Sequence, residues 1–166
     1  MIKEILEKAG KKVGLIGTIA TYINGKKLKD SDRTTPESLE LQQLFNQMVE
    51  EGVEYVVMEV SSQSLKLHRV DACDFDIVLF TNFSEDHISE KEHPNMQDYF
   101  ESKLKLFKMC KTGIVNTDDL HGAKIPNMFK ENDITTYGID NFANVTAKDI
   151  TVTNLYVCLL YTSDAA

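Results

Sequence analysis

The sequence predicts an α/β protein with a three-layer α/β/α arrangement, in which helices cover both faces of a mostly parallel sheet. Two apolar runs, residues 53–60 and 75–81, are typical of strands buried on both faces. Amphipathic helical segments alternate with these strands along the chain. With 166 residues, 42% of them hydrophobic, the chain is long enough for one domain with a sizeable core.

The first elements are a helix, a strand and a hairpin. Apolar residues recur on one face of residues 1–10, and Gly10 is suited to end that helix. Residues 13–19 then form a predicted strand. The pair Asn24-Gly25 supplies the positive φ angles of a tight turn, so we expect a hairpin or an extended excursion there, with solvated lysines at its tip.

A second helix opens at Thr35, which we expect to be its N-cap, with Pro36 at the first helical position. Gly52 ends it. The strand at residues 53–60 follows directly. The buried stripe of the helix is predicted to comprise Leu41, Leu44, Phe45 and Met48.

The second half continues the alternation after the strand at 75–81. Asn95 is suited to cap a helix over residues 95–110, whose apolar face comprises Phe100, Leu104 and Phe107. Short strands are predicted at residues 113–116 and 134–137. Residues 145–156 alternate in the manner of an edge strand or a hairpin.

Charge and cysteine content exclude several classes of protein. The formal net charge is −8 and no basic run offsets it, which argues against a general nucleic-acid or membrane-surface binder. The three cysteines are widely spaced, without a C-x-x-C pair, so neither a disulfide framework nor a zinc site is indicated. A reducing cytoplasm fits best. No segment approaches the ~20 apolar residues that span a bilayer.

Polar residues follow three of the predicted strands. Glu59 ends one strand, residues 82–87 follow the next, and residues 116–119 follow a third. Because the carboxyl ends of parallel strands meet in one crevice, Glu59 and His87 are candidate ligands for Mg²⁺ or its waters. The alternatives are an ordinary polar strand end for Glu59 and a backbone-bonded loop histidine for His87.

Lys103 lies on the helix at 95–110, beside the apolar stripe that packs on the sheet. A buried lysine loses its proton more readily, and the neutral amine reacts with carbon dioxide to form a carbamate that can bind metal. A solvated lysine is the alternative. We expect His93 and His121 to lie on the surface.

Four motifs occur in order along the chain. They are Thr34-Thr35-Pro36, the run from Glu59 to Leu65 with His68-Arg69, the run from Thr81 to His87, and the run from Tyr99 to Lys103. Together they resemble the central domain of the Mur ligases, a P-loop NTPase-like fold, and most closely the UDP-N-acetylmuramyl-tripeptide synthetases (MurE). The resemblance covers residues 1–157, and we expect residues 158–166 to be an unrelated tail.

The resemblance implies a cytoplasmic, monomeric ligase of peptidoglycan synthesis. Such enzymes use ATP and Mg²⁺ to phosphorylate the terminal carboxylate of UDP-N-acetylmuramoyl-L-alanyl-D-glutamate. The amine of the third amino acid then attacks the acyl phosphate. The transferring phosphoryl group needs metal and cationic groups that neutralise its charge.

The resemblance also implies roles for individual residues. The Mg²⁺ ligands are Glu59, His87 and Lys103, with Lys103 as N6-carboxylysine, and Lys103 and His87 are the expected catalytic residues. The muramoyl-dipeptide contacts are Thr34, Thr35, Ser61 and Arg69, and the residues lining the nucleotide crevice are Asn82 and Asn116.

Several departures from the family pattern limit this reading. The family's phosphate loop, G-T-N-G-K-[ST], has no counterpart here, since residues 14–17 lack the following Lys-Ser/Thr. Gln63 stands in place of a common histidine and Leu67 in place of a glutamine. We therefore expect a fragment that lacks the flanking UDP-binding and amino-acid-binding domains and is inactive alone.

Three other readings stay open. The chain could be a non-catalytic nucleotide- or metal-binding module. It could belong to another superfamily member, such as a folylpolyglutamate or cyanophycin synthetase. It could also be a marginal fold with an exposed sheet edge.

Overall fold

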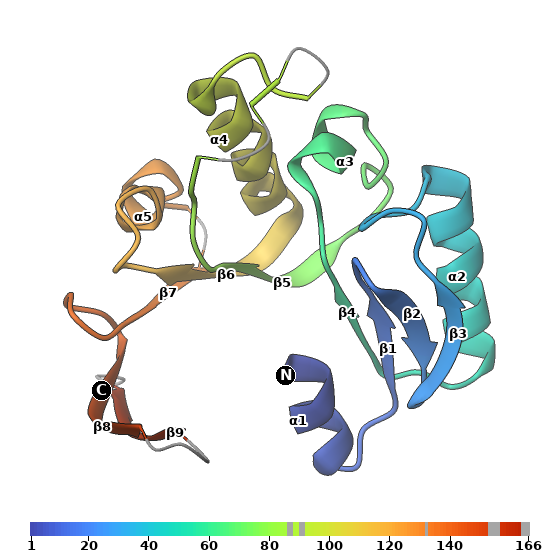
Figure 1. Cartoon of the computed structure of the whole chain (residues 1–166), viewed down its shortest axis with the longest axis horizontal. Coiled ribbons are helices and arrows are strands. Elements are labelled where there is room, and N and C mark those ends of the chain that lie inside the picture. The colour runs from blue at the N-terminus through green and yellow to red at the C-terminus, as the bar shows by residue number, and fades with distance from the viewer. Residues whose placement is uncertain (86–87, 90–91, 132, 153–156, 164–166) are drawn as a thin grey trace. The chain divides into compact units, whose positions relative to one another are not determined.

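The computed structural model describes residues 1–85, 88–89, 92–131, 133–152 and 157–163. They form two compact units, Met1–Cys73 and Asp74–Ala166, each with its own sheet (Figure 1). The predicted α/β class with parallel strands is confirmed. The strands are divided between two sheets, where the sequence suggested one.

The first unit has strand order β3-β2-β1-β4. Strands β1 and β4 are parallel, and β1, β2 and β3 form an antiparallel meander whose tight turn has φ of 49° at Asn24 and 79° at Gly25. This confirms the predicted hairpin. The elements are α1 (Ile2–Lys8), β1 (Val13–Ile16), β2 (Ala20–Ile23), β3 (Lys26–Asp30), α2 (Ser38–Glu50), β4 (Tyr55–Met58) and α3 (Ser62–Lys66).

Helix α2 packs on strand β1 through the predicted stripe. Leu41, Leu44 and Met48 are buried. A Cβ atom at Gly14 would lie 2.5 Å from the Met48 sulfur, so β1 has no side chain where the helix approaches. The N-cap of α2 is Glu37, and the prediction of Thr35 was wrong because the Thr35 side chain is used elsewhere.

Two apolar surfaces of the first unit are less buried than the sequence predicts. Helix α1 has no buried residue. Tyr55 and Val56 of β4 are 44% and 42% exposed, so the predicted burial of this strand on both faces is wrong in the structure. An apolar run shows what a strand is able to bury, whereas burial itself requires a partner on each face.

The second unit has strand order β5-β6-β7-β8-β9, with β5 to β8 parallel and β9 antiparallel to β8. Its strands are β5 (Phe75–Phe80), β6 (Cys110–Asn116), β7 (Asp133–Gly138), β8 (Val145–Val152) and β9 (Val157–Ser163). Its helices are α4 (Met96–Leu104), η1 (Lys105–Met109), η2 (Gly122–Lys124) and α5 (Ile125–Met128).

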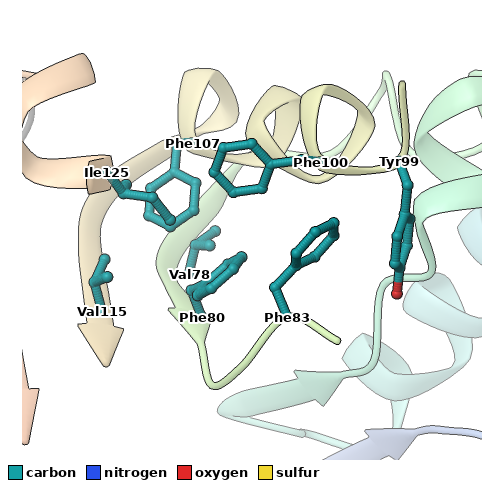
Figure 2. Close-up of a cluster of buried hydrophobic side chains, with 8 residues drawn as sticks. All are labelled: Val78, Phe80, Phe83, Tyr99, Phe100, Phe107, Val115 and Ile125. Carbon is teal, nitrogen blue, oxygen red and sulfur yellow. The ribbon is translucent and has the colours of Figure 1, made fainter. Parts of the chain in front are cut away.

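The core of the second unit lies between its helices and strands β5 and β6 (Figure 2). Phe80 contacts both Phe100 and Phe107, with ring centroids 6.3 and 6.4 Å apart. The other face of β5 is open, since Ile77 is 60% exposed. The cluster comprises Val78, Phe80, Phe83, Tyr99, Phe100, Phe107, Val115 and Ile125.

Several boundaries differ from those predicted. The helix at 95–110 is α-helical only to Leu104 and ends in a 3-10 turn, and β6 begins at Cys110. The alternating residues 145–152 are strand β8, which forms a hairpin with β9. The short helices α3 and α5 were not predicted. None of the helices in the described residues is long and apolar enough to cross a membrane.

Candidate functional site

Glu59 follows strand β4 and presents an exposed carboxylate at the end of the parallel pair β1 and β4. Its backbone N–H donates to the carbonyl of Ile16 at 2.9 Å. Its carboxylate accepts from the backbone N–H of Thr18 at 2.9 Å and from the Thr18 hydroxyl at 2.6 Å. A Cβ atom at Gly17 would lie 3.2 Å from the Glu59 carboxyl carbon, so glycine leaves room for this side chain.

Thr18 was not predicted as a site residue. Its hydroxyl also lies 3.2 Å from the Thr34 hydroxyl, and it therefore connects Glu59 to the loop before α2. The available signal was its position: a hydroxyl residue two positions beyond the end of β1, beside the strand that ends at Glu59.

Thr35 joins the same loop to the end of β4. It is fully buried, its hydroxyl donates to the Glu59 carbonyl at 3.0 Å, and it accepts from the Ser61 N–H at 3.0 Å. These two bonds engage the hydroxyl within the chain. The neighbouring Thr34 is only half-buried, so its side chain is more accessible than that of Thr35.

Arg69 contacts the same loop before α2, and its side chain is 10% exposed. It lies 3.1 Å from a Glu37 carboxylate oxygen and donates to the Thr35 carbonyl at 3.5 Å. Its Nε is buried with no hydrogen-bond partner among the described residues. Ser61 caps α3 by accepting from the Ser64 N–H at 3.2 Å.

The structure thus brings five of the predicted residues together at one strand end: Thr34, Thr35, Glu59, Ser61 and Arg69. A hollow of about 140 Å³ opens near them, lined in part by Arg33, Pro36 and Glu37. It is smaller than the ~300 Å³ at which ligand pockets begin.

The second unit places Asn82 and Asn116 at the carboxyl ends of β5 and β6. Asn82 is exposed. The Asn116 amide donates to the Thr81 carbonyl at 2.9 Å, and its oxygen accepts from the Asp118 N–H at 3.0 Å. Both polar ends of Asn116 are therefore engaged within the chain. His87 lies outside the described residues.

The carboxylates of Asp118 and Asp119 accept hydrogen bonds from several backbone N–H groups. Asp119 accepts from Phe83, at 2.9 Å, and from His121 and Gly122. Asp118 accepts from Ile139, at 2.6 Å, and from Asp140 and Asn141. Burial raises the pKa of Asp118, but these N–H donors outweigh burial and hold its pKa below the ordinary value.

Lys103 lies in the last turn of α4 and is half-buried. Its amine lies 4.9 Å from the centre of the Tyr99 ring, in a cation–π arrangement. Figure 2 shows Tyr99 within the aromatic cluster. The lysine amine therefore lies against a buried aromatic ring, and the carbamylation of Lys103 stays a prediction.

The surface positions predicted for His93 and His121 were wrong. His93 is fully buried, and its Nδ1 lies 2.6 Å from an Asp98 carboxylate oxygen. His121 is half-buried, with its ring 4.6 Å from that of Phe83. A lone histidine in sequence carries no periodic signal, so the partner that buries it becomes visible only in three dimensions.

The described residues supply only part of the predicted magnesium site. No group of three His, Cys, Asp or Glu side chains able to hold a metal occurs among the described residues. The exposed Glu59 carboxylate is nevertheless a suitable oxygen ligand for Mg²⁺. Lys103 would become one only as a carbamate.

The Mur ligase middle domain model matches residues 1–161 of the chain. A relative from Caldanaerobacter subterraneus subsp. tengcongensis, named UDP-N-acetylmuramoyl-L-alanyl-D-glutamate--2,6-diaminopimelate ligase, is 52% identical over 151 residues. A relative of the same name from Clostridium botulinum is 50% identical over 150 residues. Each match covers 90% of this chain and 30% of the relative.

A solved structure bearing the same ligase name aligns with a TM-score of 0.86 and 25% identity, covering 98% of this chain and 34% of the other. A crystal structure of MurF from Acinetobacter baumannii aligns with a TM-score of 0.51 and 16% identity, over 68% of this chain and 25% of the other, which shows likeness of fold alone. The chain spans about 30% of the length of its curated relatives. It belongs to the Mur ligase middle domain family.

Proposed function

We propose that this chain is the central part of an ATP-dependent ligase that adds the third amino acid to UDP-N-acetylmuramoyl-L-alanyl-D-glutamate in peptidoglycan synthesis. The observation that carries the proposal is the hydrogen-bonded set at the end of β4, from Thr34 to Arg69. The names of the 52% and 50% identical relatives support it, and they favour 2,6-diaminopimelate as the amino acid added.

The first unit is proposed to bind the muramoyl-dipeptide. Hydroxyl and guanidinium groups suit its carboxylates and sugar hydroxyls. Thr34 and Ser61 would contact it, and Arg69 offers positive charge through a side chain whose Nε has no partner among the described residues. Thr35 contributes by holding Thr34 and Ser61 in place, because its own hydroxyl is buried.

The phosphoryl-transfer role is proposed for Glu59, His87 and Lys103 as Mg²⁺ ligands, with Lys103 as a carbamate. The metal would neutralise charge on the phosphoryl group that passes from ATP to the substrate carboxylate. Asn82 and Asn116 are proposed to line the nucleotide site, with Asn116 acting through the loop that it holds. We further propose a cytoplasmic enzyme that is monomeric at full length.

A chimera tests the proposed function. Residues 1–152 replace the matching segment of the Caldanaerobacter subterraneus ligase, and phosphate release is measured with ATP, Mg²⁺, the muramoyl-dipeptide and either 2,6-diaminopimelate or lysine. We expect turnover with diaminopimelate. A folded chimera that binds ATP and the muramoyl-dipeptide but does not turn over would contradict the catalytic role and favour a binding module.

Two variants of the chimera localise the chemistry. Arg69→Lys keeps the charge but loses the planar guanidinium, which can donate two parallel hydrogen bonds to a carboxylate. We therefore expect KM for the muramoyl-dipeptide to rise more than kcat falls. Lys103→Ala removes the amine, and intact mass under carbon dioxide should then lack the added carboxyl group seen in the parent. An unchanged KM in Arg69→Lys would remove this residue from the proposed substrate site.

A further inference from the structure

Asn116, the last residue of β6, and Asp119, three positions further along the chain, hold the loop that follows strand β5. The Asn116 amide donates to the Thr81 carbonyl at 2.9 Å, and an Asp119 carboxylate oxygen accepts from the Phe83 N–H at 2.9 Å. The two contacts lie two residues apart on the same loop. The direction of the backbone at residues 81–83 is therefore set from the neighbouring strand.

Asp119 is itself held firmly. Its second carboxylate oxygen accepts from the N–H groups of His121 and Gly122 at 2.9 and 2.8 Å. A Cβ atom at position 122 would lie 2.1 Å from the Asn116 carbonyl oxygen, so only glycine allows this turn to close on β6. The carboxylate thus joins the turn after β6 to the loop after β5.

Side-chain packing fixes the same loop at the same residue. The Phe83 ring is 8% exposed and lies 4.7 Å from the Tyr99 ring and 5.2 Å from the Phe100 ring (Figure 2). The backbone of Phe83 is therefore held by the hydrogen bond to Asp119, and its side chain is held by packing against the aromatic rings. Residue 87 follows it four positions along the chain.

The adjacent carboxylate serves a different loop. Asp118 accepts from the N–H groups of residues 139–141, which follow β7, and not from the described residues of the loop after β5. Two neighbouring residues of the same type and with similar exposure thus hold separate loops at the same edge of one sheet.

We propose that Asp119 and Asn116 are positioning residues for the loop after β5, which carries Asn82 and leads to His87. The proposal rests on the proposed function of that loop in holding Mg²⁺ and nucleotide. It assigns these two residues an indirect role, in place of direct contact with the nucleotide. Loss of the Asp119 contact frees the loop, whereas loss of the Asp118 contact leaves the loop in place.

The test compares Asp119→Asn with the matched control Asp118→Asn in the chain itself. Amide hydrogen exchange is followed at residue 83 and at residues 139–141, together with thermal midpoint and Mg²⁺ affinity by calorimetry. In Asp119→Asn we expect residue 83 to exchange about tenfold faster and the Mg²⁺ Kd to rise about tenfold, the range typical of residues that orient metal ligands. In Asp118→Asn only residues 139–141 should exchange faster, with Kd unchanged.

A purely structural role predicts a different pattern. If Kd and the exchange at residue 83 change equally in both variants, or follow the thermal midpoint alone, the proposal is overturned. Should Asp119→Asn fail to fold, Asn116→Ala removes the contact to Thr81 together with the bond from the Asp118 N–H, while it keeps the Asp119 carboxylate. We expect about a threefold change in the same two measurements.

Failure of the proposed function is recognised separately. If the unaltered chain binds no Mg²⁺, the metal-binding role of this segment is contradicted. The positioning role is then decided by hydrogen exchange: unchanged protection of residue 83 in Asp119→Asn overturns it, and selective loss of that protection supports it.

Discussion

Glu59 in the first unit and Asp118 in the second both follow a strand that has a parallel neighbour, yet their surroundings differ. The Glu59 carboxylate is exposed and accepts from the N–H and hydroxyl of one residue, Thr18. The Asp118 carboxylate accepts backbone N–H groups from three consecutive residues of another loop. The Glu59 carboxylate is accessible to a ligand, whereas the Asp118 carboxylate is engaged in hydrogen bonds within the fold.

The difference teaches that an acidic residue at a strand end has two uses. Backbone N–H groups of a nearby loop that have no hydrogen-bond acceptor in a helix or sheet need one, and a carboxylate can accept from them. Where no such loop approaches, the carboxylate stays available for a metal or a substrate. Three variants test this contrast, from the largest expected effect on stability to the smallest.

Thr35→Val should have the largest effect. It leaves the Glu59 carbonyl and the Ser61 N–H without their buried partner, at a cost of about 2–3 kcal/mol in the free energy of unfolding. Urea unfolding measures the loss. Thr35→Ser keeps the hydroxyl, loses only the methyl group and should lose about 1 kcal/mol or less; a loss in Thr35→Val no larger than that in Thr35→Ser would contradict the role of the hydroxyl.

Asp118→Asn should have an intermediate effect, about 1 kcal/mol at neutral pH, since one charged acceptor is lost. Because its pKa is lowered in the folded state, Asp118 stabilises the fold above its ordinary pKa of 3.8, and this stabilisation is lost as pH falls through the lowered folded value. The thermal midpoint of the parent chain should therefore fall more steeply below about pH 3.8 than that of the variant. Parallel curves would contradict this assignment.

Glu59→Gln should change stability least, by about 0.5 kcal/mol or less, because the side chain is exposed. Its effect should appear in ligand binding, with Mg²⁺ affinity reduced at least about tenfold. Glu54→Gln is the matched control: Glu54 is an exposed glutamate before the amino end of β4 and should leave affinity unchanged. If both variants bind Mg²⁺ as the parent does, Glu59 belongs with Asp118 as a residue of the fold.

The family and most of the elements were predictable from local signals. The Asn24-Gly25 turn, the apolar stripe of α2 and the Asn95 cap of α4 each follow from the conformational preference or spacing of a few adjacent residues. The roles predicted for Thr34, Glu59 and Arg69 were implied by the resemblance to the Mur ligases, which the ordered motifs carry.

The wrong predictions concern residues whose surroundings depend on a partner outside their own element. Thr35 looks like an N-cap because its sequence neighbours are Pro36 and Glu37. In the structure its hydroxyl is hydrogen-bonded to the backbone after β4, at Glu59 and Ser61. His93 looks like a surface residue until α4 places Asp98 beside it.

By itself, the sequence determined the α/β class, the order of elements and the chemical types present at each strand end. These depend on periodicity and on turn and cap preferences, which act over a few residues. The tertiary structure alone decided which polar groups are engaged and which are exposed. Only when loops from different strands meet does it become clear that Asn116 and Asp119 hold a loop while Glu59 remains accessible, because each hydrogen bond depends on a partner far away along the chain.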